Sequence, residues 1–529
     1  MQNRKLQVWL PLMLSAAMAL GIFFGFKMRD GFPAKNFFYT EKRNPLKEVI
    51  DIINRKYVDS IDENKLADTA IVAMLSKLDP HSAYIAASEL EEVNEEINGS
   101  FFGIGIEYNI FSDSMHIINV FKDGPAFKAG LQVGDIILKA NDSLLTGKKL
   151  KSETIRKSMR GPLGSTLQLQ ILRAAKLQTV KMQRGNIPIF SMEAAYMLNN
   201  NTGYIKLDKF TKQTYREFML ALESLKKKGL QKLVLDLRGN GGGVLDEAVE
   251  IADEFLAGEK LITYTEGLHV KKKEYRCRRQ GQFEEGKLVV LADERSASAS
   301  EILLGALQDW DRATIIGRRS FGKGLVQEQF DLSNKAALRL TVARYFTPVG
   351  RSIQRNFKNG NNAYFNEVAI RYTNGSLIYA DSSKNDSSKI YKTKNGKTIF
   401  GGGGISPDIF IAADTGRIDS AFAKLYFKGV LSDFGYLYVI QNPSASKLYK
   451  TSESFASSFV LNDADWKYFS TLALKDSIDV SNISENKRIY ISRMLKASIA
   501  RQLFRTEGYY EVMNADDKAV QKALEILNK

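Results

Sequence analysis

Two residues of this 529-residue sequence, Ser298 and Lys323, have the neighbours that nucleophilic chemistry needs. An apolar run at 287–292 indicates a buried strand, and the apolar spacing from Ser298 onward indicates a helix. Ser298 therefore lies at a strand-to-helix turn, where an exposed nucleophile and free backbone N–H donors come together. Lys323 is flanked by two glycines in a loop after a second short strand, 313–317. A serine and a lysine in these settings indicate a hydrolase that uses a Ser/Lys pair.

Other interpretations of the same stretch stay open at this point. Residues 296–300 could simply cap an ordinary amphipathic helix, because serine is a common N-cap. Ser320 and Lys323 match the Ser-x-x-Lys pattern of the penicillin-binding enzymes, but the companion Ser-Asp-Asn and Lys-Thr-Gly tripeptides are absent from the sequence. A Ser-His-Asp triad would have to use His81, which is better explained as a turn histidine that hydrogen-bonds local backbone.

Two motifs carry a family resemblance: Ser296-Ala297-Ser298-Ala299-Ser300-Glu301 and Phe321-Gly322-Lys323-Gly324. They resemble the active-site motifs of the carboxyl-terminal processing peptidases, also called tail-specific proteases. The phrase Leu78-Asp79-Pro80-His81-Ser82 is similar to this family as well. The resemblance implies Ser298 as nucleophile, Lys323 as general base and Gln327 as the residue that orients the lysine.

Two physical requirements follow for these roles. An exposed lysine is a poor base at neutral pH, so we expect burial to lower the pKa of Lys323. On a straight strand Lys323 and Gln327 would lie ~13 Å apart, so their contact requires a bend in the backbone. Glu301 is an alternative third member, because it lies one helical turn from Ser298 on the same face.

A glycine-rich loop, Asp236-Leu237-Arg238-Gly239-Asn240-Gly241-Gly242-Gly243, follows a predicted buried strand. It is not a phosphate-binding P-loop, because no Gly-Lys-Ser/Thr follows, and Val244 stands where a dinucleotide fingerprint needs its last glycine. Such a loop can instead aim N–H groups at an oxyanion. The family resemblance implies that this loop supplies one donor, with Gly241 and Gly242 as candidates, and that Ala299 supplies the other.

Residues 101–184 form a compact unit. The order of its elements is a hairpin of strands 101–110 and 115–121, a short helix after Gly124-Pro125, a helix at 152–159 and strands 166–172 and 177–183. This order resembles a PDZ domain. Phe102-Gly103-Ile104-Gly105 matches the loop whose backbone amides hold the terminal carboxylate of a peptide. The glycines permit close approach, and the following strand would pair with the peptide.

The N-terminal residues 6–26 form an uncharged stretch that is preceded by Arg4 and Lys5. Roughly 20 residues span the ~30 Å hydrocarbon layer of a bilayer. A cleaved signal peptide is the alternative, but the end of the stretch lacks an A-x-A-like cleavage site. We therefore expect an uncleaved single-pass anchor in the cell inner membrane, with the catalytic part in the periplasm if the source is a diderm bacterium.

Composition limits the classes of partner. The chain is 44% apolar and 26% charged, as in folded globular proteins, and its net charge is +15. The basic residues are scattered, with no aromatic-interleaved groove, so we expect no nucleic-acid partner. The single cysteine, Cys277, excludes an intrachain disulfide and a cysteine-based metal cluster, and we expect no metal or organic cofactor.

Together these observations predict an α/β multidomain protein: a crotonase-like (ClpP/crotonase-type) peptidase core with an inserted PDZ domain and helical N- and C-terminal segments. The expected parts are a membrane anchor at 6–26, a helical segment at 41–98, the PDZ domain at 99–185, the core at 186–412 and a helical domain at 413–529. The expected function is a membrane-anchored serine endopeptidase that cuts C-terminal tails of exported or unfolded proteins. A non-catalytic PDZ adaptor on an inactive peptidase fold is the alternative, and the helical ends could form a homodimer.

Overall fold

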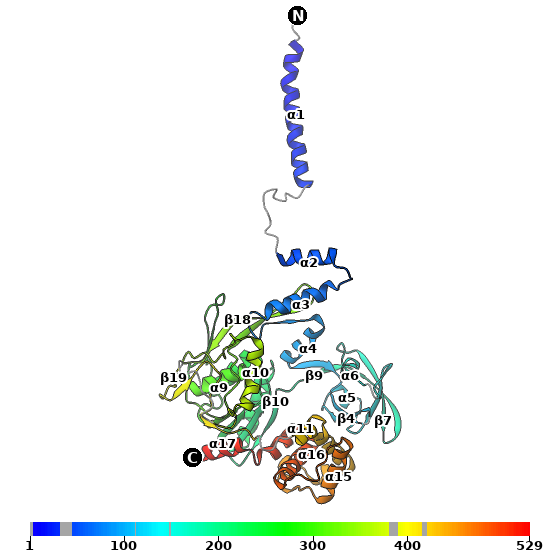
Figure 1. The fold of residues 1–529 in the computed structure, drawn as a ribbon, viewed down its shortest axis with the longest axis vertical. Coiled ribbons are helices and arrows are strands. Elements are labelled where there is room, and N and C mark those ends of the chain that lie inside the picture. Colours follow the sequence, from blue (N-terminus) through cyan, green and yellow to red (C-terminus); the bar gives the residue numbers. More distant parts are fainter. Residues whose placement is uncertain (1–3, 32–44, 112, 148–149, 380–389, 415–419) are drawn as a thin grey trace. The chain divides into compact units, whose positions relative to one another are not determined.

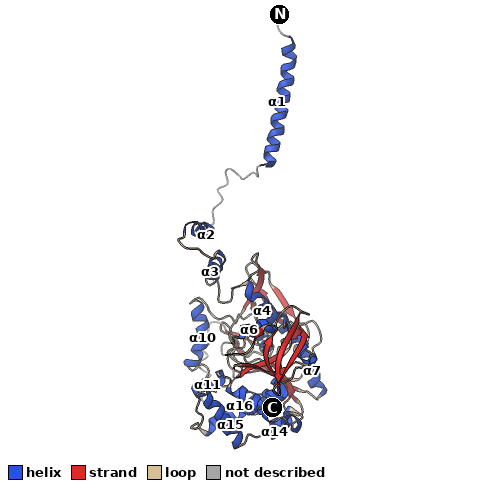
Figure 2. Ribbon diagram, turned by 90° about the vertical axis from the view of Figure 1, so that its right-hand side faces the viewer, coloured by secondary structure: helices blue, strands red, loops and turns tan. Residues whose placement is uncertain are grey.

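A computed structural model of the chain describes residues 4–31, 45–111, 113–147, 150–379, 390–414 and 420–529. The chain divides into two units, Met1–Ala70 and Ile71–Lys529. The boundary that we expected at residue 41 lies outside the described residues. The first unit is helical, whereas the second combines helices and strands (Figures 1 and 2).

The first unit contains α1 (Arg4–Gly31) and α2 (Pro45–Lys56), and α3 (Glu63–Leu75) begins in it. Within α1, the 19 residues Trp9–Lys27 have a mean hydropathy of 1.8 and are long and apolar enough to cross a membrane. Helix α2 has no buried side chain, and its apolar Val49 and Ile52 are exposed.

The centre of the second unit is a six-stranded sheet. Its strands lie in the order β10 (Met192–Met197), β11 (Thr202–Leu207), β12 (Lys232–Asp236), β15 (Lys287–Ala292), β16 (Thr314–Gly317) and β21 (Ile409–Phe410). Strands β11 to β21 are parallel, and β10 is antiparallel to β11. Parallel strands covered on both faces need continuous apolar sequence, which explains the apolar runs.

The two faces of this sheet pack against different helices. In β12, Leu233 and Leu235 belong to the apolar cluster of one face, which includes α7 (Thr214–Lys227), α8 (Leu245–Asp253) and α9 (Ala299–Asp309). Val234 points to the opposite face, where Ala519, Val520 and Ala523 of α17 (Lys518–Asn528) cover the sheet. The carboxyl ends of β12 and β15 thus emerge from a sheet that is fixed on both sides.

A second, antiparallel sheet carries the segment after Lys323. It contains β1 (Ala83–Ile85), β13 (Leu261–Glu266), β14 (Lys273–Arg276), β17 (Leu325–Asp331) and β18 (Ala337–Phe346). Strand β18 pairs with β1, β13 and β17, so it joins the Leu-Asp-Pro-His segment to the lysine loop.

The PDZ-like region contains a sheet of β3 (Ile106–Phe111), β4 (Ser114–Val120), β5 (Ile136–Ala140), β6 (Ser143–Leu144), β7 (Thr166–Arg173) and β8 (Lys176–Gln183), with helices α5 (Pro125–Lys128) and α6 (Ser152–Met159). The expectation of one strand over 101–110 is wrong. Strand β2 (Ser100–Gly103), which follows α4 (Ala87–Asn98), pairs with β9 (Gly185–Pro188), whereas β3 pairs with β4.

The chain after residue 356 is more helical than its polar composition indicates. The polar composition of residues 356–400 is typical of an insertion or of surface hairpins, and the segment contains α10 (Asn361–Thr373) as well as the hairpin of β19 (Ile390–Lys392) and β20 (Thr398–Phe400). The C-terminal helices, orange and red in Figure 1, are α11 (Ser420–Phe427), α12 (Val430–Gln441), α13 (Ala445–Leu448), α14 (Ser452–Ser458), α15 (Asp463–Lys475) and α16 (Glu485–Asn514). They enclose an apolar cluster of their own.

Candidate active site

Ser298 lies at the N-terminus of α9, six residues after the end of β15. Its backbone has φ 56° and ψ −114°, a conformation that residues other than glycine seldom adopt. The preceding turn is held by the buried Asp293, whose carboxylate accepts hydrogen bonds from the backbone N–H groups of Gly239 and Arg295. A strained residue that its surroundings hold in place is common at active sites. The predicted strand-to-helix turn is confirmed.

Glu301 connects the serine turn to the lysine loop. Its side chain is fully buried, and its carboxylate accepts hydrogen bonds from the backbone N–H groups of Ser298 (2.9 Å), Gly322 (2.7 Å) and Lys323 (2.8 Å). The hydroxyl of Ser320 donates to the same carboxylate. Burial raises the pKa of Glu301, while these hydrogen bonds lower it. A single side chain therefore fixes the backbone on both sides of the site.

Lys323 lies in a loop that other chain segments hold from both directions. The N–H of Phe321 donates to the carbonyl of Ser296, and the N–H of Gly324 donates to Oε1 of Gln354 at 2.7 Å. Burial lowers the pKa of Lys323, and the nearby Arg339 lowers it further, while Glu301 and Asp79 raise it. The direction agrees with our expectation of a desolvated lysine.

The side chains of the candidate nucleophile and base are not joined in this state: among the described residues, no hydrogen bond connects Ser298 Oγ to Lys323 Nζ. Their backbones are nevertheless connected through Tyr345, whose hydroxyl donates to the carbonyl oxygens of Ser298 (3.0 Å) and Lys323. Catalytic hydrogen bonds often form only when substrate is bound, so this geometry is compatible with a Ser/Lys pair.

Gln327 lies on β17, next to an irregularity between Val326 and Gln327. Its Nε2 donates to Oγ1 of Thr341 at 3.3 Å, and the Thr341 hydroxyl donates to Asp79 at 3.0 Å. Within the part of the chain that the structure covers, no hydrogen bond joins Gln327 to Lys323. Strand β17 begins at Leu325, so Lys323 lies in the loop that precedes it.

The candidate oxyanion donors differ in availability. The N–H of Ala299, the first residue of α9, and the N–H of Gly241 have no acceptor among the described residues. The N–H of Gly242 donates to Oδ1 of Asn240 at 2.9 Å, so it is occupied. Gly242 lies against Ser298: a Cβ built on it would be 2.7 Å from Cβ of Ser298. Of the two candidate glycines, Gly241 is therefore the one whose N–H is left without an acceptor among the described residues.

The start of the glycine loop is anchored by charge. The buried Asp236 accepts hydrogen bonds from Arg238 and from the hydroxyl of Tyr204 (2.8 Å). Burial would raise the pKa of Asp236, but Arg238 and Lys206 hold it at about 2. Arg238 also contacts Asp517 at 2.8 Å, the residue that caps α17. These bonds place the loop relative to the sheet and not relative to substrate.

His81 does not contact Ser298. Its Nε2 is 3.0 Å from the hydroxyl of Tyr364, and its backbone N–H donates to Asp79. Burial and the nearby Lys323 lower its pKa to about 4. The side chain thus bonds a distant tyrosine and not the local backbone that we expected.

Asn240 and Tyr345 contribute to the site but were not among the predicted site residues. The carbonyl of Asn240 accepts bonds from the N–H of Ala297 and the hydroxyl of Ser300, each at 3.0 Å. Asn240 lies inside the glycine-rich motif 236–243, and this position could have indicated that it belongs to the site. Tyr345 sits in a strand 47 positions after Ser298, and no local pattern connects the two.

The peptide-binding candidates Phe102, Gly103, Ile104 and Gly105 lie where β2 ends and β3 begins. Gly105 has φ +78°, a left-handed conformation that favours glycine, and Ile104 is buried. Phe102 is 41% exposed. The loop is therefore a backbone turn with one exposed aromatic side chain at its start.

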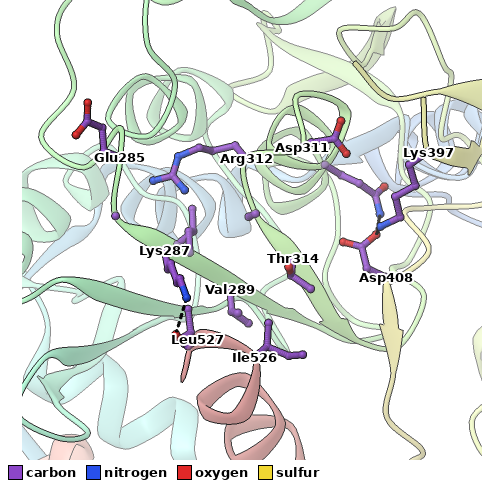
Figure 3. A pocket seen from close by; sticks show the side chains of 14 residues that line it. Glu285, Lys287, Val289, Asp311, Arg312, Thr314, Lys397, Asp408, Ile526 and Leu527 are labelled. Carbon is purple, nitrogen blue, oxygen red and sulfur yellow. Dashed lines mark hydrogen bonds and ion pairs between the residues drawn. The ribbon is translucent and has the colours of Figure 1, made fainter. Parts of the chain in front are cut away.

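A separate pocket of about 450 Å³ lies at the opposite end of the strands that lead to Ser298. Lys287, the first residue of β15, points there toward the end of α17 and donates to the carbonyl of Leu527 (Figure 3). None of the predicted site residues lines this pocket. Among the described residues, no three His, Cys, Asp or Glu side chains are gathered as a metal site would require.

Comparison with known proteins adds independent information. Residues 201–359 match peptidase family S41, residues 103–183 match the PDZ domain, and residues 33–89 match the N-terminal domain of the activating protease CtpB. Residues 421–505 match a family of unknown function.

Two relatives and one solved structure illustrate the similarity. The carboxy-terminal-processing protease of Bartonella bacilliformis is 36% identical over 316 residues, which are 58% of this chain and 71% of that protein. A probable CtpA-like serine protease of Staphylococcus epidermidis is 34% identical over 320 residues, which are 59% of this chain and 64% of that protein. The photosystem II D1 C-terminal processing protease shares 24% identity, over 71% of this chain and 93% of that chain, with a TM-score of 0.35.

Proposed function

The chain belongs to peptidase family S41, the serine peptidases that include the carboxy-terminal-processing proteases, and from this we propose that Ser298 and Lys323 cut polypeptides near their C-termini. One observation carries the proposal. Glu301 binds the backbone of both residues, and burial lowers the pKa of the lysine, so a serine hydroxyl and a base that can be neutral share one rigid frame.

The reaction would proceed in two halves. Neutral Lys323 takes the proton from Ser298 Oγ as the oxygen attacks the scissile carbonyl carbon. The N–H groups of Ala299 and Gly241 stabilise the resulting oxyanion. The protonated lysine then gives its proton to the departing amine, which leaves an ester on Ser298. Water, deprotonated by Lys323, hydrolyses this ester and regenerates the serine.

Gln327 would act one step away from the reaction. Its amide is bound to Thr341, and Thr341 to Asp79, whose negative charge favours the protonated form of Lys323. A small rearrangement on substrate binding would bring the amide to the lysine, as the family resemblance implies. In the present state Glu301 and Tyr345 each contact both Ser298 and Lys323.

The PDZ-like region would select the substrate. The backbone turn Phe102-Gly103-Ile104-Gly105 would bind the terminal carboxylate, and the tail would pair with β3 as an added strand. Unfolded or exported proteins with free, apolar C-termini are the substrate class that this arrangement accepts. A tail held there supplies its scissile bond to the core of the same chain.

The location of the enzyme forms part of the proposal. Helix α1 would remain uncleaved as a single-pass anchor in the inner membrane, with the peptidase on the periplasmic side. The core would be of the crotonase-like type, and the helical ends could join two copies. The exposed apolar side chains of α2, such as Val49 and Ile52, support such a contact.

The proposal is tested with the protein from about residue 45 onward, incubated with an unfolded protein that ends in an apolar tail. Wild type and the Ser298→Ala and Lys323→Ala variants run in parallel, with an amidated substrate as control. Cleavage by wild type alone, slowed by amidation, supports the proposal. Cleavage by Ser298→Ala contradicts it. Binding of the free tail by all three proteins without cleavage would favour the adaptor function instead.

A further inference from the structure

We propose that Tyr345 is a positioning residue for the Ser/Lys pair, because its hydroxyl holds the peptide group of the nucleophile and that of the base at the same time. The inference rests on the proposed function. Tyr345 is 1% exposed and lies on β18, where its backbone N–H donates to the carbonyl of Gly324 at 3.1 Å. Its backbone and side chain thus both contact the lysine loop.

The hydroxyl is fixed in direction. The ring belongs to the apolar cluster beneath α9, so the phenol reaches the site from the core and has no room to rotate away. The single O–H proton is shared in a bifurcated hydrogen bond between the carbonyl oxygens of Ser298, at 3.0 Å, and Lys323. Burial and the nearby Glu301 raise the pKa of Tyr345, so the phenol keeps its proton and remains a donor.

Holding the Ser298 carbonyl also sets the direction of an oxyanion donor. A trans peptide is planar, and its C=O and N–H point in opposite directions. The carbonyl of Ser298 and the N–H of Ala299 belong to the same peptide. The bond from Tyr345 to that oxygen therefore contributes to the orientation of the Ala299 N–H, which has no acceptor among the described residues.

The lysine side depends more strongly on the tyrosine. The carbonyl of Ser298 also accepts bonds from the N–H groups of Glu301 (2.8 Å) and Ile302 (3.0 Å). The carbonyl of Lys323 has no donor other than Tyr345 in the described part of the chain. At the other end of that peptide the N–H of Gly324 is bound to Gln354. Loss of the hydroxyl would thus free one end of the peptide that carries the base.

The test compares Tyr345→Phe with Tyr215→Phe. Tyr215 lies on α7, and its hydroxyl donates to Glu254 at 2.7 Å, so the control removes a hydrogen-bonded phenol of the same domain at a distance from the site. Two rates are measured well below the melting temperature of each variant: tail cleavage, and modification of Ser298 by a small fluorophosphonate. Affinity for a tail peptide is measured by fluorescence anisotropy.

We expect Tyr345→Phe to lower kcat and the modification rate together, by about 10- to 100-fold, because misplacement of reacting groups has effects of that size. Tail affinity should be unchanged, and Tyr215→Phe should keep the wild-type rates. A variant with 4-aminophenylalanine at position 345 retains a hydrogen-bond donor. It should recover at least half of the loss in kcat and in the modification rate, measured on a logarithmic scale. This variant also keeps the test decisive if the phenylalanine variant does not fold.

Wild-type rates in folded Tyr345→Phe would overturn the inference. An equal loss in Tyr345→Phe and Tyr215→Phe, or no recovery with 4-aminophenylalanine, would overturn it as well, since both results indicate a role in stability alone. Ser298→Ala is run in the same series. If that variant still cleaves, the proposed function has failed, and this result is distinct from any result at Tyr345.

Discussion

The carboxylate of Glu301 accepts a hydrogen bond from the backbone N–H of Lys323 at 2.8 Å, which ties the lysine loop to the helix that begins at the serine. The same oxygen accepts the N–H of Ser298. The two residues that the chemistry requires come from different loops, and a buried acid decides their relative position. Several features of the site depend on this contact.

Replacing Glu301 by Gln should therefore damage both stability and activity. In wild type the backbone N–H groups of Ser298, Gly322 and Lys323 donate to the carboxylate, and in the variant some of them would face the amide NH₂ of the glutamine. Each buried donor left without an acceptor costs about 1–3 kcal/mol. We expect a loss of roughly 2–4 kcal/mol in the free energy of unfolding, with little cleavage by the folded fraction. Denaturant titration and cleavage per folded molecule measure the two effects.

Glu254→Gln is the matched control, because Glu254 is also buried and hydrogen-bonded but lies at the C-terminus of α8. It should lose stability without losing activity per folded molecule. A fully active Glu301→Gln would show that the carboxylate is not needed to hold the site.

Gly242→Ala should disturb the nucleophile directly. The new Cβ would lie 2.6 Å from the carbonyl oxygen of Ala297 and 2.7 Å from Cβ of Ser298, at a φ of +95°. We expect kcat to fall at least about 100-fold, because the serine must shift. Steady-state kinetics on the tail substrate measures this change.

The control for Gly242→Ala is Gly258→Ala, at a φ of +75° with no atom within 4 Å of the added Cβ. It carries a comparable backbone cost of about 1–2 kcal/mol without contact with the site. Equal kinetics for both variants would exclude a steric role of Gly242.

Gly105→Ala should weaken capture of the tail. Gly105 has φ +78°, and an added Cβ would lie 3.2 Å from Cδ1 of Ile187, so the turn that carries the amides must shift. We expect weaker binding of a peptide with a free carboxylate, and no change for the amidated peptide, as measured by fluorescence anisotropy.

Gly130→Ala has φ +79° in the same domain and no atom within 4 Å. Its binding should stay at the wild-type level. If both variants bind alike, the carboxylate is held elsewhere.

His81 should make the fold sensitive to acid. Its pKa is lowered from 6.5 to about 4 by burial and by the nearby Lys323. Between pH 4 and pH 6.5, His81 binds a proton more readily in the unfolded chain than in the folded protein. The contribution of His81 to the free energy of unfolding is therefore complete above pH 6.5 and declines as the pH falls toward 4. The free energy of unfolding should decline less steeply with acid in His81→Gln than in wild type. His269→Gln, at an exposed position, should keep the wild-type slope, and a reversed order would refute the assignment.

The sequence predicts well those elements that local pattern determines. The apolar run at 287–292 forms the expected strand, Lys287–Ala292, because a parallel strand covered on both faces needs a nearly continuous apolar sequence. Helix Ser152–Met159 also begins and ends as expected. Ser298 at its turn could be found because the pattern changes there from a strand to a helix.

Features that depend on distant segments could not be predicted. Alternation runs on through residues 101–110, and the break between β2 and β3 arises because β2 pairs with β9, at Gly185–Pro188. Helix α10 lies in a polar stretch, and its Glu367 is bound by Arg355 and Arg371. The partners of Glu301 and Gln327 likewise depend on how the lysine loop and β18 meet, which no local spacing encodes.

We propose that Lys323 is a neutral base for Ser298, and the pH dependence of Ser298 modification by a fluorophosphonate tests this role most directly. The adduct is located by mass spectrometry, and the rate is measured in wild type and in Lys323→Arg, which stays protonated. Burial lowers the pKa of Lys323, so the wild-type rate should rise with pH at a midpoint below the ordinary lysine value. Lys323→Arg should show little modification at any pH. A wild-type midpoint at or above the ordinary lysine pKa, or an adduct on a residue other than Ser298, would contradict the account.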